Sequence, residues 1–434
     1  MFKFNFSADD LEFDDPSLAS EDQEVDQLSQ PLSTLSVSGS TTTATDDSKA
    51  SQESSSEISV VPASQLDLLS KSLLHALPST LHYELAQIPL IHPGSGAATA
   101  IATDLKTGQQ KEVITLYKRN LEDVKFQIAQ DDDEFDNDQE DSQSKEQKSG
   151  PGGVEMLALA GTSDLVKGVY EGGLKTWECA LDLVAYLAEQ KDNYDGKKVL
   201  ELGCGSALPG IFVLTQSESV QVDLQDYNDQ VLKLVTLPNV LLNSYIRPDQ
   251  QPPVQEVEDD SEDEDEKEEK SKETDGGDEE DDEDEDEDED DEPEADPADG
   301  DFQGVEIDLP VSEDERRSLL TRVQKQSRFF MGDWGGLVDL MAFKDESEKY
   351  DLILTSETIY AEESHPKLYA TIKNSLKRNG GRALVAAKTF YFGVGGDILS
   401  FRQLIEKDGV FDVKVVFSAQ SFVRREILEL TFKK

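Results

Sequence analysis

The sequence predicts an α/β fold in which a largely parallel sheet carries helices on both faces. From residue 198 onward, short apolar runs alternate with longer segments whose apolar residues recur at helical spacing. The first of these runs, 198–202, leads directly into a glycine-rich loop. A strand followed by such a loop and then by a helix is typical of sheets that bind nucleoside-like ligands.

The negative charge of the chain is concentrated in segments that cannot form a core. The 434 residues have a formal net charge of −54, and residues 256–301 alone hold 32 acidic residues against three lysines. Such segments bury too little apolar surface to become ordered. We therefore divide the chain into a disordered tail (1–60), a partly ordered extension (61–130), an acidic linker (131–153) and a domain (154–434) interrupted by a disordered acidic insert (250–310).

The composition argues against several classes of function. An acidic chain disfavours direct binding of nucleic acid and favours basic protein partners. The sequence has no long apolar run and no signal segment, so we expect a soluble, monomeric protein of the cytoplasm and nucleus without membrane contact. Its two cysteines, Cys179 and Cys204, supply neither a disulfide framework nor a cysteine metal site, and we expect no metal.

The segment that precedes the sheet gives weaker signals. Residues 67–77 have apolar side chains at helical spacing, and residues 115–118 and 124–128 have the composition of short strands. We expect this extension to act as a lid or a substrate ledge. The domain begins near residue 165, where two glycines allow a sharp turn before a helix over 181–187.

The glycine loop carries the first functional signal. Gly203 and Gly205 permit positive φ angles and leave space for a ligand. Glycines at 203, 205 and 210 match neither a dinucleotide fingerprint nor a P-loop. Glu201, at the end of the strand, would repel a pyrophosphate but attract a cationic ligand, such as one with an amino group beside a sulfonium. The alternative is an ordinary strand-to-helix turn.

The elements that follow alternate as in a parallel sheet. The acidic insert interrupts them after a helix, and the last two strands are predicted to pair as an antiparallel hairpin. In order, the predicted elements are strand 198–202, helix 208–216, strand 220–224, helix 229–242, helix 313–325, strand 328–332, strand 351–355, helix 366–378, strand 382–387, helix 397–408, strand 412–418 and strand 424–432.

Polar residues follow the predicted strands at the edge where a ligand would lie. Asp226 stands about 20 residues beyond the glycines, where a carboxylate can bind both ribose hydroxyls, although it could instead cap the next helix. After the third strand, Asp333 could bind an adenine amino group, and Trp334 could form a wall beside it or pack in the core. After the fourth strand, Glu357 and Tyr360 are expected to face the reacting group.

Together these segments resemble the methyltransferase-like family that modifies non-histone proteins, which carries an acid-x-x-Tyr motif after its fourth strand. The segments 172–179 and 391–396 are most similar to its protein-histidine methyltransferase branch. The resemblance covers roughly residues 165–434 without the insert. The motifs are Trp177-Glu178-Cys179, Glu201-Leu202-Gly203-Cys204-Gly205, Gln225-Asp226-Tyr227-Asn228, Gly332-Asp333-Trp334, Ser356-Glu357-Thr358-Ile359-Tyr360 and Lys388-Thr389-Phe390-Tyr391-Phe392-Gly393-Val394-Gly395-Gly396.

The resemblance implies a seven-stranded, Rossmann-like class I methyltransferase sheet with S-adenosyl-L-methionine as cofactor and a basic large-subunit ribosomal protein as substrate. It implies that residues 388–396 shape the slot for the target side chain, while Glu357 and Tyr360 are expected to be catalytic. The residues expected to bind the cofactor are Lys175, Thr176, Trp177, Glu178, Cys179, Glu201, Gly203, Gly205, Gln225, Asp226, Tyr227, Gly332, Asp333, Trp334 and Ser356.

A histidine target needs orientation more than it needs a base. Imidazole, with a pKa of about 6.5, already offers a lone pair at neutral pH, whereas lysine, with a pKa of about 10.4, must first lose a proton. Glu357 or Tyr360 could accept the N–H of one ring nitrogen and aim the other at the methyl group. The nearest alternative is a lysine methyltransferase of the same family. An alternative from another class is a non-catalytic acidic chaperone for basic ribosomal proteins. The four histidines, expected to be structural or solvated, are His75, His82, His92 and His365.

Overall fold

A computed structural model describes residues 60–103, 108–128, 172–248, 305–419 and 423–434. The predicted tail up to residue 59, the acidic linker, the start of the domain near residue 165 and most of the insert lie outside these residues. Within the described ranges, no helix is both long enough and apolar enough to cross a membrane.

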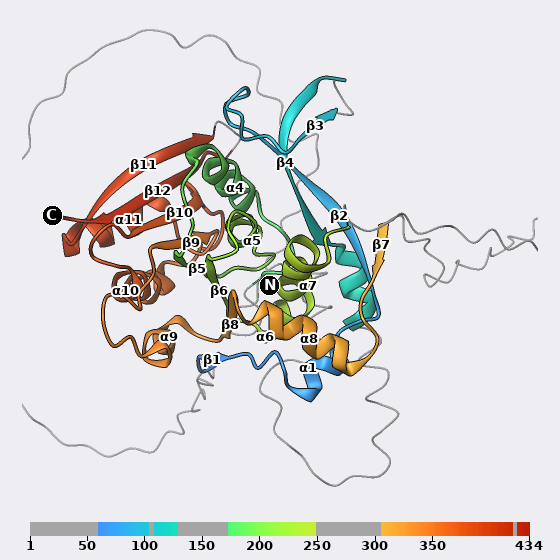
Figure 1. The fold of residues 1–434 in the computed structure, drawn as a ribbon. Coiled ribbons are helices and arrows are strands. Elements are labelled where there is room, and N and C mark those ends of the chain that lie inside the picture. Colours follow the sequence, from blue (N-terminus) through green and yellow to red (C-terminus); the bar gives the residue numbers. More distant parts are fainter. Residues whose placement is uncertain (1–59, 104–107, 129–171, 249–304, 420–422) are drawn as a thin grey trace, which may run out of the picture. The chain divides into compact units, whose positions relative to one another are not determined.

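Eight strands form the larger of the two sheets in the described residues, in the order β1-β8-β6-β5-β9-β10-β12-β11 (Figure 1). The five strands from β8 to β10 are parallel, and β12 runs antiparallel between β10 and β11. The α/β class is therefore confirmed, and β1 adds an antiparallel edge strand that was not predicted. The bounds are β1 Ser64–Gln65, β5 Lys198–Leu202, β6 Gln221–Asp226, β8 Ser327–Met331, β9 Leu352–Ser356, β10 Arg382–Lys388, β11 Phe411–Ala419 and β12 Arg425–Phe432.

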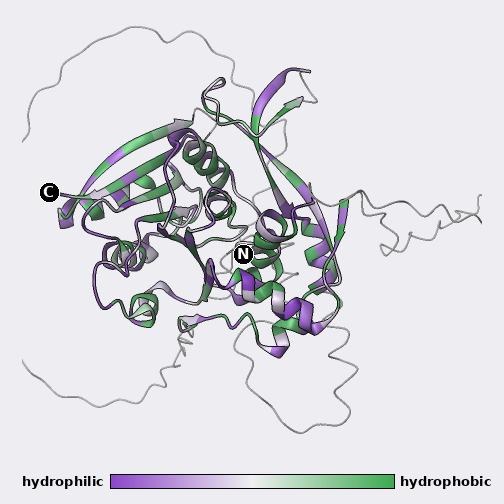
Figure 2. Cartoon of the chain, viewed as in Figure 1, coloured by the Kyte–Doolittle hydropathy of each residue, from purple (hydrophilic) through white to green (hydrophobic). Residues whose placement is uncertain are grey.

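Alternation along the strands divides the buried side chains between two cores. Val199 and Leu224 belong to a core with residues of α4, α5, the helix 229–246 and α8, whereas Leu200 and Ile353 belong to a core with α9, α10 and α11. α5 is buried along its whole length and is mainly green in Figure 2. The bounds are α4 Glu178–Gln190, α5 Leu208–Thr215, α8 Glu313–Val323, α9 Trp334–Met341, α10 His365–Ser375 and α11 Ile398–Asp408.

The helix over residues 229–246 is continuous but contains two π-helical turns. It joins α6 (Asp229–Val231) and α7 (Leu237–Leu241) through Leu232–Thr236 and ends in Leu242–Ile246. Pro238 lies inside it and has no N–H to donate, which accords with the widened turn that precedes it. The helix thus runs four residues beyond the predicted end at 242.

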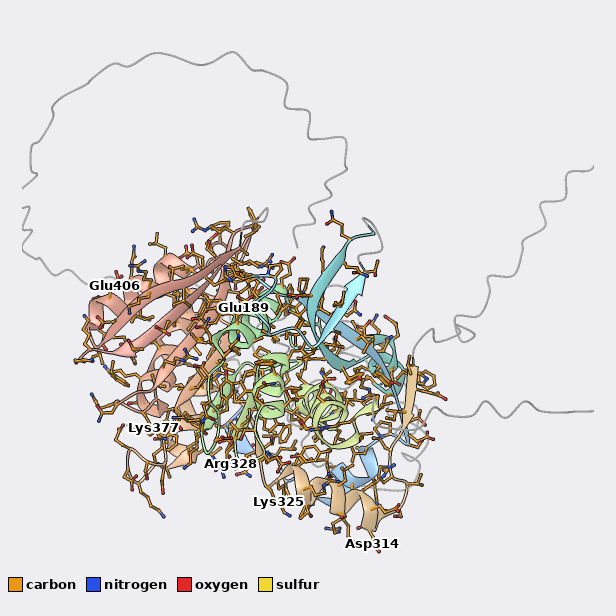
Figure 3. The ribbon with its side chains drawn as sticks, turned by 45° about the horizontal axis from the view of Figure 1, so that its top comes forward. Glu189, Asp314, Lys325, Arg328, Lys377 and Glu406 are labelled. Carbon is orange, nitrogen blue, oxygen red and sulfur yellow. The ribbon has the colours of Figure 1, made fainter. Side chains whose placement is uncertain are left out.

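α8 ties the sheet to the N-terminal extension. The buried Arg316 guanidinium donates hydrogen bonds to the carbonyl oxygens of Pro310 (2.6 Å) and Leu74 (2.8 Å). The side chain of Ser312 caps the helix by accepting a hydrogen bond from its first turn. Asp314, labelled in Figure 3, lies in that turn with two other acidic residues, where the helix dipole favours negative charge.

A smaller sheet combines the extension with the chain that follows the insert, in the order β3-β4-β2-β7. The prediction placed the end of the disordered insert at residue 310, but Val305–Asp308 forms β7 and pairs antiparallel with β2. The buried Ile307 joins a core with Leu81 of β2, which anchors the strand. The other strands are β2 Thr80–Pro89, β3 Ala100–Thr103 and β4 Gln110–Arg119.

One element of the extension was predicted wrongly. Residues 124–128, expected as a strand, belong to a helix over 121–128. Asn120 caps it by accepting a hydrogen bond from the N–H of Glu122 (2.8 Å). The helix buries Val124 and leaves Phe126 53% exposed, whereas a strand would place both on one face. The predicted helix 67–77 contains the shorter α1 (Lys71–Ala76).

Candidate active site

The glycine loop follows β5 and is packed from two sides. Gly203 and Gly205 have φ angles of +60° and +50°. A Cβ at Gly203 would lie 2.5 Å from Cγ2 of Thr358, and a Cβ at Gly205 would lie 3.3 Å from the backbone of Gly173. Both positions therefore require glycine for the backbone angle and for the close approach of neighbouring segments.

Glu201 lies beneath this loop and is fully buried. Its Oε2 accepts a hydrogen bond from the N–H of Gly210 in the first turn of α5 (2.7 Å). Its Oε1 has no hydrogen-bond partner among the described residues. Burial raises the pKa of Glu201 to about 8, in spite of the hydrogen bond from Gly210. That this carboxylate attracts a cationic ligand stays a prediction.

Gln225, at the end of β6, connects three segments of the site. Its Oε1 accepts hydrogen bonds from the N–H of Gly203 (3.2 Å) and from Nε1 of Trp334 (2.7 Å). Its Nε2 donates to the carbonyl oxygen of Gly332 (2.8 Å). The buried amide thus fixes the glycine loop against the turn after β8, a structural role that the sequence did not indicate.

Asp226 is buried directly beside the glycine loop. Its Oδ2 accepts a hydrogen bond from the N–H of Gly205 (2.9 Å), and its Oδ1 accepts one from the N–H of Asn228 (3.2 Å). Asn228 is the residue that precedes α6, so Asp226 does not occupy the cap position that was the alternative prediction. The structure places Asp226 where the carboxyl ends of β5 and β6 meet.

The turn after β8 brings together the other predicted adenosine residues. Asp333 caps α9 by accepting a hydrogen bond from the N–H of Gly335 (2.8 Å), and it forms an ion pair with Lys367 (2.7 Å). Trp334 is half-buried, with its indole held by Gln225 and near Gly203. The tryptophan therefore lines the loop and does not belong to the deep core.

A strap from the N-terminal extension, residues 60–66, crosses this turn. The N–H of Asp333 donates to the carbonyl oxygen of Val61 (2.9 Å), and the N–H of Val61 donates to the hydroxyl of Tyr227 (3.3 Å). A Cβ at Gly332 would collide with the carbonyl oxygen of Pro62. The extension thus contacts the predicted cofactor side of the sheet. Its role as a lid or a substrate ledge stays a prediction.

The predicted cofactor segment from Lys175 to Cys179 divides between two environments. The Trp177 ring is approached by the Nζ atoms of Lys175 (5.3 Å to the ring centroid) and of Lys388 (5.1 Å). Glu178 forms an ion pair with Arg425, the first residue of β12 (3.3 Å). Cys179 is buried beside Glu357, and burial followed by the charge of Glu357 raises the pKa of its thiol.

Glu357 has a constrained position after β9. Its φ is +57°, rare for a residue with a Cβ, and its side chain is only 7% exposed. Its Oε2 accepts a hydrogen bond from the Tyr391 hydroxyl (2.6 Å), which in turn accepts one from the N–H of Lys388 (3.2 Å). Its Oε1 has no hydrogen-bond partner in the described ranges and lies 3.7 Å from the Lys388 ammonium.

Tyr360, Thr176 and Ser356 are the remaining predicted residues. The backbone oxygen of Tyr360 accepts a hydrogen bond from Gly396 (2.8 Å), which pins the loop after β10. Neither the half-buried Tyr360 nor Glu357 is among the residues that line the pocket at the ends of β10 and β12. Thr176 and Ser356 are also half-buried at the same end of the sheet. The catalytic role of Tyr360 and the cofactor roles of Thr176 and Ser356 stay predictions.

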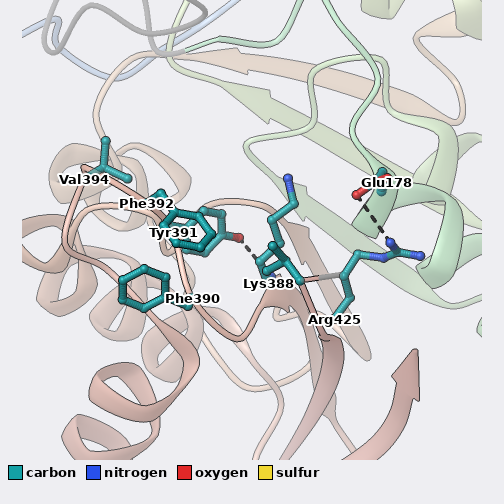
Figure 4. A pocket seen from close by; sticks show the side chains of 8 residues that line it. Glu178, Lys388, Phe390, Tyr391, Phe392, Val394 and Arg425 are labelled. Atoms are coloured by element: carbon teal, nitrogen blue, oxygen red, sulfur yellow. Dashed lines mark hydrogen bonds and ion pairs between the residues drawn. The ribbon is translucent and has the colours of Figure 1, made fainter. Parts of the chain in front are cut away.

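A pocket of about 420 Å³ opens at the ends of β10 and β12. Figure 4 shows an aromatic wall on one side, a pair formed by Glu178 and Arg425 on the other, and Lys388 between them. Phe390 and Phe392 are 48% and 72% exposed, so the wall offers apolar surface at its rim. The pocket is lined by Glu178, Lys388, Phe390, Tyr391, Phe392, Val394, Val423 and Arg425.

The histidines do not contribute to this arrangement. His365 is buried with Nε2 against the carbonyl oxygen of Ile359 (2.8 Å), and His92 contacts Glu189 (2.7 Å). His82 lies beside Asp123 (3.2 Å) in the extension. The described residues contain no group of three or more histidine, cysteine or acidic side chains that could hold a metal ion.

The order of the strands, with the reversed β12 inserted before the edge strand β11, is the arrangement of a class I methyltransferase, and the cofactor of this class is S-adenosylmethionine. Residues 164–258 match the family described as lysine methyltransferase. The chain is also 31% identical over 325 residues to the histidine protein methyltransferase 1 of Schizosaccharomyces pombe, which covers 72% of this chain and 76% of that protein. The chain belongs to the histidine protein methyltransferase 1 family.

Other relatives extend the comparison. The chain is 35% identical over 271 residues to the histidine protein methyltransferase 1 homolog of Rattus norvegicus, covering 62% of this chain and 59% of that protein. It is 31% identical over 277 residues to the homolog of Dictyostelium discoideum, covering 63% and 62%. The match thus spans about three fifths of the length of these two relatives.

Proposed function

We propose that this protein transfers a methyl group from S-adenosylmethionine to a ring nitrogen of a histidine in a protein substrate. The observation that carries the proposal is the state of Glu357. Oε1 of its buried carboxylate has no hydrogen-bond donor among the described residues, and a buried acceptor of this kind is stabilised by a donor from a bound group. An imidazole N–H entering from the pocket would supply the missing donor.

The residues at the cofactor side fit the proposed cosubstrate. Beneath the loop, Oε1 of the buried Glu201 side chain also has no hydrogen-bond partner in the described ranges. The carboxylate of Asp226 is held by the N–H of Gly205 at the end of β6, where a ribose would lie. Trp334, oriented by Gln225, supplies an apolar wall. S-adenosylmethionine, when bound, supplies an electrophilic methyl group on a sulfonium.

Glu357 would orient the target and hold its proton. Tyr391 fixes one carboxylate oxygen, so the other can accept the N–H of one ring nitrogen and select the tautomer. The lone pair of the second ring nitrogen would then form the new N–CH₃ bond as the methyl–sulfur bond breaks, and the sulfur would keep that electron pair in the leaving S-adenosylhomocysteine. The methylated ring carries a positive charge, which Glu357 stabilises until the N–H proton is released to water. Alignment of this kind can contribute several kcal/mol, with about 7 to 11 as an upper range.

The substrate we propose is a basic protein, specifically a large-subunit ribosomal protein. The family resemblance supports this assignment, and so does the acidic charge of the chain, which attracts cationic partners. Lysine is the alternative target, favoured by the description of the family that matches residues 164–258. That match ends before β9 and β10, so it does not include Glu357 or Lys388.

A labelling experiment tests the proposal. Tritiated S-adenosylmethionine is incubated with the enzyme and with ribosomal proteins from cells that lack it, and the labelled protein is hydrolysed for amino-acid analysis. We expect labelled methylhistidine with the wild type, greatly reduced label with Glu357→Gln, and unchanged label with the surface variant Glu406→Gln. Labelled methyllysine in place of methylhistidine would contradict the proposed target.

A further inference from the structure

Lys388 places a positive charge beside the carboxylate proposed to receive the target. It is the last residue of β10, and its side chain is 21% exposed. Its Nζ lies 3.7 Å from Oε1 of Glu357, the oxygen that has no hydrogen-bond donor among the described residues. The same ammonium lies over the ring of Trp177. Lys388 therefore lies between the pocket, which it lines, and Glu357, which is not among the lining residues.

The backbone of Lys388 and the carboxylate of Glu357 are held by the same hydroxyl group. The backbone N–H of Lys388 donates to the Tyr391 hydroxyl, whose own proton is donated to Glu357. The other nearby cation, Arg425, is held away by Asp182 (2.5 Å) and Glu178 (3.3 Å). Lys388 is thus the cation that pairs with Glu357 within the described part of the chain.

The geometry points to Lys388 as the residue that makes the site select a neutral imidazole over the ammonium of a lysine. This inference rests on the proposed histidine activity and deepens it. A lysine side chain arrives almost entirely charged at neutral pH, whereas most imidazole is uncharged. Two ammonium groups within about 4 Å of each other repel strongly in a partly buried site. Without Lys388, Glu357 would instead attract a target ammonium.

Paired peptide substrates test the inference. One set of synthetic peptides covers each histidine of the large-subunit ribosomal proteins, and a matched set has that histidine replaced by lysine. Full-length wild type, Lys388→Met and Lys388→Arg are each incubated with tritiated S-adenosylmethionine and both sets. We expect Lys388→Met to raise the ratio of lysine to histidine labelling by about tenfold or more, because it removes the charge and keeps the length. Lys388→Arg keeps the charge and should keep the wild-type ratio.

The outcomes separate this inference from the proposed function. Histidine labelling by the wild type with a ratio unmoved in Lys388→Met would overturn the role of Lys388 alone. Lysine labelling by the wild type, or no labelling of any peptide, would overturn both claims. Lys388→Gln serves as a second neutral variant, and thermal unfolding verifies that each variant is folded. A loss of rate that is equal on both peptide sets would mean a structural role and would also contradict the inference.

Discussion

The polar residues at the ends of β5, β6 and β8 bind one another, whereas Lys388, at the end of β10, lines an open pocket and lies beside Glu357, which follows β9. On the cofactor side, Gln225 and Asp226 each hold the glycine loop by a backbone hydrogen bond. On the target side, Glu357 has one oxygen held by Tyr391 and the other without a donor in the described ranges. We call the first region, formed by Gln225, Asp226 and the glycine loop, the frame, because its polar groups already bind one another. In the second region, Glu357 keeps one oxygen that could accept a hydrogen bond from a bound substrate.

This difference changes how mutations must be interpreted. A substitution on the cofactor side removes a ligand contact and also loosens the loop, so affinity and stability should fall together. A substitution at Glu357 should act mainly on turnover, because the frame does not depend on it. Comparing the free energy of unfolding, cofactor affinity and turnover for matched variants therefore tests whether the two regions are distinct.

The largest effect is expected for Gly203→Arg, which should abolish methylation. Any Cβ at this position meets Thr358 at 2.5 Å, and φ of +60° strains a side chain further. The control is Gly380→Arg, at a positive φ with nothing within 4 Å of the added Cβ. Turnover and cofactor affinity are measured for both. Activity retained in Gly203→Arg would show that the cofactor does not lie at this loop.

Glu357→Gln should lower turnover by about 10² to 10³ while leaving cofactor affinity within about twofold of the wild type, since one oriented electrostatic group is worth this much. The amide keeps the acceptor for Tyr391 and so preserves the packing. Single-turnover kinetics and calorimetric binding of the cofactor separate the two quantities. A parallel fall in affinity would place Glu357 on the cofactor side and remove the contrast between the regions.

The sequence predicted the frame better than it predicted the contacts within it. The predicted strands of the larger sheet end within two residues of the observed ends, because period-two apolar runs and the glycines mark them clearly. Gln225 and Asp226 were predicted as polar residues at a strand end. Their role in holding the glycine loop depends on partners that are distant in the sequence, such as Trp334. No local pattern contains that information.

Missed elements share a related cause. β7 has four residues and, among the described strands, pairs only with β2, more than 200 positions earlier in the chain. The strap at Val61 is held by hydrogen bonds to Tyr227 and Asp333, through backbone groups that every residue carries. The hydroxyl that donates a hydrogen bond to Glu357 belongs to Tyr391. The sequence predicted that Tyr391 lies in the target slot but did not predict this hydrogen bond. Long-range pairing and backbone contacts leave little trace in composition or periodicity.

Asp226→Ala should weaken cofactor binding by roughly 1.5 to 3 kcal/mol for each lost charge-assisted hydrogen bond, or about tenfold to a hundredfold. It should also destabilise the fold modestly, because the N–H of Gly205 loses its acceptor. Asp229→Ala, which removes a partly exposed carboxylate three residues on, is the control. Calorimetric affinity equal to the wild type would exclude a ribose contact.

Glu201 should make the stability of the protein depend on pH. Its pKa is raised from 4.5 to about 8 by burial, so the folded state binds the proton more tightly than the unfolded state. Its contribution to the free energy of unfolding should therefore decrease as pH rises from 4.5 to 8, by an amount on the order of a few kcal/mol. Glu201→Gln should flatten this slope and the exposed Glu406→Gln should not. Parallel curves of Tm against pH for Glu201→Gln and wild type would contradict the assignment.

The smallest effect is expected from the acidic insert, whose residues 256–301 carry a net charge of −29. Deleting them leaves β7 in place on β2. Methylation of a short peptide should be unchanged, while association with an intact basic ribosomal protein should slow several-fold at low salt, because charges attract over a Debye length of about 10 Å at 0.1 M salt. A neutral replacement of equal length separates charge from spacing and should behave like the deletion. Equal association rates for the wild type, the deletion and the neutral replacement, at both low and high salt, would mean that the insert is only a spacer. Capture of the substrate would then depend on the folded domain and its pocket, and not on the charge of the insert.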